Sequence, residues 1–320
     1  MKTAYRNCLF FLVCFIMNIA YAQPEKVADV MKRLNAGLNP PLMFQDYTNG
    51  LESAIAFLEQ INTLQSEENR SKVVGFSAEL YYKAKAKHSQ LDAREVDTFI
   101  SLMVSLMRMD SSSRVRSEAA RSLRKFVQPE LIDRYHFSIL NAYEMHHNSE
   151  ILFLYASLPS CKPETAIRLV RSIQTESTIG TYMINAILAR FDDQSATDTL
   201  IVTAENIFEI GDICLSELLG ALAFTRSDKI KRFLVRGLRA DDYITLAGGN
   251  KIPRRNCYAK ALSLMNKFNE EFPVKNKYDF YTANDLDMIE QWCVEKLGMS
   301  VSSAPRKEMF EIPSFQPVEK

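Results

Sequence analysis

Three basic residues between positions 114 and 125 form the first set of side chains that could bind a charged ligand. Arg114, Arg121 and Lys125 are spaced by seven and four residues, and this spacing places them on one face of a helix. Such a face could receive an acidic partner protein. The alternative is an ordinary solvated helix face.

A second basic group lies near position 250. The stretch AGGNK, residues 247–251, has the glycines of a phosphate-binding loop but lacks its spacing and its following Ser or Thr. Lys251, Arg254 and Arg255 nevertheless stand at a predicted helix start, where free backbone N–H groups favour anions. The region 241–255 also forms the longest predicted connection between helices, and long connections are often functional.

The sequence shows no further pattern for catalysis or metal binding. It contains neither GxSxG nor HExxH. The adjacent histidines His146 and His147 would point about 100° apart on a helix, so they cannot easily share one ion. We therefore predict no catalytic residue, no metal site and no cofactor.

The N-terminus has the three parts of a secretory signal peptide. Lys2 and Arg6 precede an apolar run over residues 8–19, and the small residues Ala20 and Ala22 stand where a signal peptidase needs them. The run is shorter than the ~20 residues of a membrane-spanning helix, which argues against an anchor. We expect cleavage after Ala22 and export to the periplasm or the cell exterior.

The charge of the chain limits the class of its partner. The sequence has 39 basic and 39 acidic residues, a balance that argues against nucleic acid. No second apolar run is long enough to span a bilayer, so no stable membrane insertion is expected after cleavage. The expected partner is another protein.

Four cysteines follow the signal peptide: Cys161, Cys214, Cys257 and Cys293. An oxidising compartment permits disulfides. Cysteines this few and this widely spaced do not form the framework of a disulfide-rich protein. The sequence leaves open whether two of them pair or whether they are buried thiols.

Apolar residues recur with helical spacing along most of the chain. In the segments 51–64 and 96–107 they fall at intervals of three and four residues, which forms one apolar stripe on a helix. Alternating, strand-like runs are hard to find. The sequence therefore predicts an all-α protein.

The segment 110–123, DSSSRVRSEAARSL, gives the clearest sign of repetition. Val115, Ala119 and Leu123 share one face, and the small alanines allow a partner helix to approach closely. Weaker copies follow at 151–158, 179–187, 213–222 and 254–262, preceded by amphipathic helices at 130–145, 164–173, 197–208 and 228–238. The steps between copies, roughly 28 to 41 residues, are those of two-helix repeats.

This segment resembles the second helix of a HEAT repeat, with an aspartate in the turn, a Val-Arg pair early in the helix, and then Ala-Ala and Leu. The resemblance implies an α-α superhelix, a HEAT-like (armadillo-type) solenoid of stacked antiparallel helix pairs. It also implies that Asp110 and Arg116 take the roles of the turn aspartate and helix arginine that commonly link neighbouring HEAT repeats, with each as the other's expected partner. Leu152 and Cys214 replace the arginine in later copies, so we expect no continuous ladder.

These observations predict five parts: a signal peptide (1–22), an N-terminal helical segment that is a cap or early divergent repeats (23–90), HEAT-like repeats (91–270), a C-terminal capping helix (271–300) and a poorly ordered tail (301–320). The predicted function is a non-catalytic protein-binding scaffold. The alternative function is a HEAT-like lyase or hydrolase with a site near 241–255. An irregular helical bundle is the alternative architecture.

Overall fold

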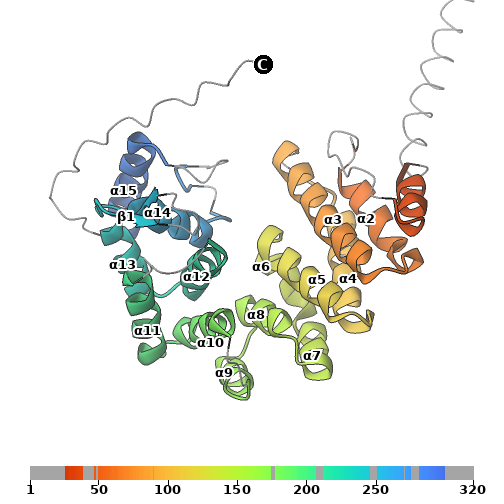
Figure 1. The fold of residues 1–320 in the computed structure, drawn as a ribbon, viewed down its shortest axis with the longest axis horizontal. Helices are drawn as coiled ribbons and strands as arrows, with labels where there is room; N and C mark the ends of the chain where they lie inside the picture. Colours follow the sequence, from red (N-terminus) through yellow and green to blue (C-terminus); the bar gives the residue numbers. More distant parts are fainter. Residues whose placement is uncertain are drawn as a thin grey trace, which may run out of the picture. The chain divides into compact units, whose positions relative to one another are not determined.

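The computed structural model describes residues 26–38, 47, 50–88, 90–173, 177–206, 212–245, 251–269, 271–274 and 281–299 (Figure 1). The predicted signal peptide and C-terminal tail lie outside these ranges. The chain divides into two compact units, Met1–Lys162 (unit 1) and Pro163–Lys320 (unit 2). None of the helices described combines the length and apolarity that crossing a bilayer requires.

Unit 1 is built from helix pairs. After helical residues 26–35 it contains α2 (Gly50–Glu59), η2 (Ile61–Thr63), α3 (Glu67–Lys87), α4 (Ala93–Met109), α5 (Ser113–Phe126), α6 (Pro129–Ile132), η3 (Asp133–Tyr135), α7 (His136–His146) and α8 (Ser149–Ser157). Helix α2 packs on α3, α4 on α5, and α7 on α8. The first helices of these pairs form one layer, α2–α4–α7, and the second helices form the other, α3–α5–α8.

Polar N-caps begin α3, α4, α5 and α8 of unit 1. The side chains of Ser66, Asp92, Ser112 and Asn148 accept hydrogen bonds from backbone N–H groups in the first turns of α3, α4, α5 and α8. Each cap of this kind contributes about 1 kcal/mol. The serine-rich stretch 111–113 is therefore the start of a helix.

Equivalent helices in the second layer run in the same direction. At the start of α5, the Ser112 hydroxyl donates to Glu67 at the start of α3. At the far end, the Phe126 ring packs on the ring of Tyr82, toward the end of α3. The N-terminal ends of α3 and α5 therefore lie side by side, and so do their C-terminal ends.

The first layer shows the same direction. The Tyr135 hydroxyl, just before α7, donates to Asp97 near the start of α4. His146 at the end of α7 has Nε2 2.9 Å from the carbonyl oxygen of Arg108, near the end of α4. Successive helix pairs in unit 1 are thus stacked in parallel register.

Unit 2 continues the alternation of helix pairs. It contains α9 (Pro163–Arg171), α10 (Thr178–Arg190), α11 (Gln194–Glu205), α12 (Asp212–Thr225), α13 (Asp228–Gly237), β1 (Tyr243–Thr245), β2 (Lys251–Pro253), α14 (Arg254–Met265) and α15 (Ala283–Leu297). The pairs are α9–α10, α11–α12 and α13–α14, with α10, α12 and α14 stacked in one layer and α11 against α13 in the other. At matching helix ends, Arg190 of α10 donates to the carbonyl oxygen of Phe224 in α12.

The prediction of a mainly helical protein is confirmed, and the described residues add one short hairpin to it. Strands β1 and β2 pair antiparallel, with Ile244 opposite Ile252, in the region predicted to be a loop. Tyr243 and Thr245 are exposed while Ile244 is fully buried. The alternation is thus present, but a strand of three residues is too short for its period to be recognised in the sequence.

Candidate partner-binding surfaces

Helix α5 carries four of the five residues expected to pack the repeat, and the fifth, Asp110, precedes it. Val115, Ala119 and Leu123 are fully buried, on the face that contacts α3, α4 and α8. Asp110, which ends α4 as its C-cap residue, is also buried. Arg116 is partly buried.

The carboxylate of Asp110 pairs with Arg70 of α3 instead of the expected Arg116. Arg70 makes a two-pronged contact, with Nε 2.9 Å from Oδ2 and a terminal nitrogen 3.0 Å from Oδ1. Arg116 instead donates to the backbone carbonyl oxygens of Asp110 and Ser111. The expected side-chain pairing of Asp110 with Arg116 is therefore wrong, although the two residues do contact each other.

Arg70 occupies the position in α3 that Arg116 occupies in α5. Each arginine stands four residues after a serine N-cap, Ser66 in α3 and Ser112 in α5. Asp110 therefore links the second helices of two neighbouring pairs. The sequence contains this signal as Ser-x-x-x-Arg, but the residues around Arg70 do not repeat the Val-Arg-x-x-Ala-Ala pattern, so the pattern does not identify this copy.

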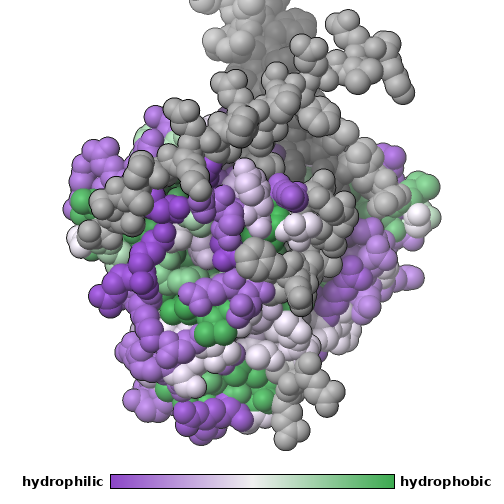
Figure 2. Space-filling view, turned by 60° about the vertical axis from the view of Figure 1, so that its left-hand side comes forward, coloured by the Kyte–Doolittle hydropathy of each residue, from purple (hydrophilic) through white to green (hydrophobic). Residues whose placement is uncertain are grey.

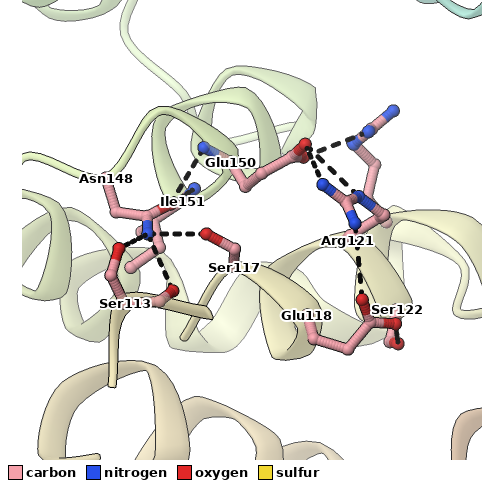
Figure 3. A network of polar contacts seen from close by, with 9 residues as sticks. Ser113, Ser117, Glu118, Arg121, Ser122, Asn148, Glu150 and Ile151 are labelled. Atoms are coloured by element: carbon pink, nitrogen blue, oxygen red, sulfur yellow. Dashed lines mark hydrogen bonds and ion pairs between the residues drawn. The ribbon is translucent and has the colours of Figure 1, made fainter. Parts of the chain in front are cut away.

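The next contact between second helices uses different residues (Figure 3). Glu150 of α8 accepts from Arg121 at 3.0 Å and from Arg124 at 3.3 Å, both on α5. The side-chain amide of Asn148 donates to the hydroxyls of Ser113 and Ser117. Amide–hydroxyl and carboxylate–arginine contacts thus link α5 to α8, where the sequence led us to expect the ladder to stop.

These contacts change the interpretation of the basic face on α5. Arg121 is engaged by Glu150 and also by Glu118, and the Lys125 ammonium lies over the Phe126 ring. Arg114 is exposed. The spacing of the three cations is as predicted, but the charge of Arg121 is largely compensated within the fold.

Replacing Glu150 by glutamine should lower the free energy of unfolding by about 1.5–3 kcal/mol, the range for a hydrogen bond that involves a charged group. The glutamine keeps the shape but removes the charge that pairs with Arg121 and Arg124. Urea unfolding followed by circular dichroism measures the loss. The matched control is Glu118→Gln, whose 3.4 Å contact with Arg121 is more exposed and should be worth below about 1 kcal/mol. Equal losses in the two variants would contradict the importance of the Glu150 contact.

The three residues of the second predicted basic group, at the hairpin and the start of α14, have different surroundings. Arg254 donates to the carbonyl oxygen of Glu205 and pairs with Asp242 at 3.1 Å. Arg255 is buried in the first turn of α14. Lys251 alone of the three is exposed, on β2. The expected shared anion site of Lys251, Arg254 and Arg255 is therefore not assembled by the residues that the structure describes.

Three of the four cysteines are free, buried thiols: Cys161, Cys257 and Cys293. The side chain of Cys214 lies outside the described part of the chain. Burial raises the pKa of Cys257 to about 11, and burial with a smaller contribution from the Glu290 charge raises the pKa of Cys293 to about 12. Both thiols are therefore protonated at neutral pH and are poor nucleophiles.

We expect Cys257 and Cys293 to resist a thiol reagent in the folded protein and to react after unfolding in urea, as mapped by mass spectrometry of labelled peptides.

The burial of these two thiols also makes the free energy of unfolding depend on pH. Above about pH 9 the unfolded thiols lose protons that the folded state retains, so the free energy of unfolding falls as the pH rises toward 11. A Cys257→Ala variant should show a shallower fall. Rapid labelling of either cysteine in the native state would contradict this picture.

A basic groove lies between α13 and the end of α15. It has a volume of about 740 Å³ and is lined by Asp228, Lys229, Lys231, Arg232, Val235, Arg236, Lys296, Leu297, Gly298 and Met299. In the described ranges, no group of three or more His, Cys, Asp or Glu side chains could hold a metal ion. The groove brings five basic side chains to one concavity, and we take it as the candidate site.

The sequence of α13 contains the signal for this groove. Lys229, Arg232 and Arg236 are spaced by three and four residues, so they form one outward stripe. Ile230, Phe233 and Leu234 turn inward and are buried. In the sequence alone this stripe is only the polar side of an amphipathic helix, because the other wall of the groove comes from residues 296–299, some sixty positions later.

The chain matches no protein-family model, no curated protein and no solved structure.

Proposed function

We propose that this chain is an exported HEAT-like repeat protein, periplasmic or secreted, that binds another protein and does not catalyse a reaction. The observation that supports the proposal most is the stacking of like helices on like helices, with the pair α2–α3 stacked in the same way as its successors. The contact of Asp110 with Arg70 joins neighbouring pairs in the manner expected from the HEAT resemblance. Stacked repeats of this kind build extended surfaces for partner proteins.

The enzyme alternative finds less support. Its expected location, the region 241–255, forms the β-hairpin and the start of α14. Of the described charged residues there, Asp242 and Arg254 pair with each other and Arg255 is buried, whereas Lys251 is exposed. They do not line the groove between α13 and α15, so we favour binding over catalysis.

The proposal is tested by isolating the tagged chain, with its own N-terminus, from the exported fraction of its source cell after chemical cross-linking. We expect the mature chain to begin at Gln23 and a specific protein to be cross-linked to it. A chain that keeps its first residues and stays inside the cell would overturn export. An exported chain with no cross-linked protein under repeated conditions would overturn the scaffold.

A further inference from the structure

The groove between α13 and α15 has an excess of positive charge on a chain that is balanced as a whole. Its lining includes five cations, Lys229, Lys231, Arg232, Arg236 and Lys296, against one carboxylate, that of Asp228. The complete sequence has 39 basic and 39 acidic residues. The positive charge is therefore local to the groove, which favours recognition of a compact acidic group over attraction to a long polyanion.

The lysines of the groove already have partners within the fold. Lys229 pairs with Asp198, Lys231 with Asp228, and Lys296 with Glu271. The hydrogen bond and charge of Lys231, with a smaller contribution from Arg232, hold the pKa of Asp228 below its usual value. Asp228 therefore stays ionised and is occupied by Lys231.

The two arginines differ from the lysines. Within the part of the chain that the structure describes, no ion pair or hydrogen bond engages the guanidinium of Arg232 or Arg236. Both are exposed and stand four residues apart on α13, so they project from adjacent turns of one face. A guanidinium presents a planar fork that matches a carboxylate, and the two are placed to receive two carboxylates about one helical turn apart.

The groove also has an apolar component. Val235 lies between the two arginines in the sequence and is almost fully buried, while Leu297 and Met299 of the opposite wall are partly exposed. Figure 2 brings the side with α11, α13 and α15 forward, and hydrophilic residues there surround small hydrophobic areas. A ligand of this groove would combine carboxylates with an apolar side chain. An acidic segment of a protein carries both kinds of group.

We propose that the groove between α13 and α15 is the docking site for an acidic segment of the partner protein, with Arg232 and Arg236 binding two carboxylates and the partly exposed Leu297 and Met299 contacting an apolar side chain between them. This inference rests on the proposed function and adds the chemistry of the partner. The volume of about 740 Å³ lies within the range of well-formed ligand sites.

The test uses a fluorescein-labelled peptide of glutamate and leucine, with its glutamine–leucine counterpart, in fluorescence anisotropy titrations at physiological salt. The complete mature chain is compared with Arg232→Glu/Arg236→Glu and with the matched control Arg94→Glu/Arg168→Glu. The control reverses two exposed helix cations in α4 and α9 that do not line the groove. Circular dichroism melts confirm that the three proteins are folded.

We expect the glutamate peptide to bind the wild type and the control with similar affinity, and the groove variant to lose at least about tenfold, as expected when charge pairs at a binding site become like-charged. The glutamine peptide should bind much more weakly. Equal binding of the two peptides would overturn carboxylate recognition. Equal loss in both variants would overturn the groove as the site, and groove-dependent binding of anionic lipid vesicles without peptide binding would assign it to a membrane surface.

The same two variants separate this proposal from the scaffold proposal. If cross-linking in the exported fraction recovers the same protein with the wild type and the groove variant, the chain is a scaffold and the groove is not the docking site. If the groove variant alone loses the protein, both proposals stand. If no protein is recovered while the groove binds the glutamate peptide, the chemistry of the groove stands and the scaffold function fails.

Discussion

Replacing Asp110 by alanine is expected to lower the free energy of unfolding of unit 1 by about 3–5 kcal/mol, the range for removing one partner of a buried ion pair. The side chains of Asp110 and Arg70 are only 3% and 12% exposed. Without the carboxylate, Arg70 keeps its charge with only backbone oxygens around it. The backbone N–H of Ser112 also loses the acceptor that Asp110 provides.

Urea unfolding measures this loss with two probes. Circular dichroism follows all helices, whereas the fluorescence of Trp292, the only tryptophan of the chain, follows α15 in unit 2. We expect the helical transition to move to lower urea while the Trp292 transition changes much less.

Two further variants identify the cause of the loss. Asp198→Ala removes an exposed partner of Lys229, with 57% of its side chain accessible, and should cost no more than about 1 kcal/mol. The double variant Arg70→Met/Asp110→Leu replaces both charges by apolar groups and should recover much of the stability. An Asp110→Ala variant as stable as Asp198→Ala would show that the buried ion pair does not stabilise the stack.

Replacing Gly237 by alanine should destabilise unit 2 by about 1–3 kcal/mol, the cost of overpacking a filled core. An exposed glycine in a helix normally gains stability from this change, by about 0.5–1 kcal/mol. At the end of α13, however, an added Cβ would lie 2.0 Å from Cδ2 of Tyr258 and 2.4 Å from its Cε2. The Tyr258 ring is buried and packs edge-on against Phe233, so it has little room to move.

The matched control for this prediction is Gly220→Ala in α12. An added Cβ there meets no atom within 4 Å, and the change should raise stability by about 0.5–1 kcal/mol. The urea transition of Trp292 fluorescence measures both variants. The changes in the free energy of unfolding should have opposite signs in the two variants. The double variant Gly237→Ala/Tyr258→Leu should lose less stability than the sum of the losses in its two single variants. A stabilised Gly237→Ala variant would contradict the close packing of α13 on α14.

The helices of this chain could be predicted from its sequence because each helix is determined by residues within or next to it. The four copies expected after α5 correspond to α8, α10, α12 and α14, and their first helices to α7, α9, α11 and α13. Apolar spacing and cap residues such as Ser112 and Asn148 act within one turn. They therefore appear in the sequence even where the repeat itself has diverged.

The candidate site could not be predicted, because it depends on which side chains meet across helices. Arg121 has the spacing of an exposed binding residue, and only the packing of α8 on α5 shows that Glu150 takes its charge. Arg255 and Arg232 are both basic residues on predicted helices, yet one is buried and the other is exposed. Residue type and spacing do not distinguish them, since the difference arises from the neighbouring helices.

The parallel stacking of like helices also determines how the chain can fold. The bonds between stacked helices join residues close in sequence, 45 positions apart for Ser112 and Glu67 and 31 for Lys229 and Asp198. The loops closed by each docking step are therefore of similar, moderate length, and their entropic cost does not grow as the stack lengthens. A chain emerging N-terminus first can add each helix pair to the one just completed, so folding can keep pace with emergence instead of waiting for the last residue.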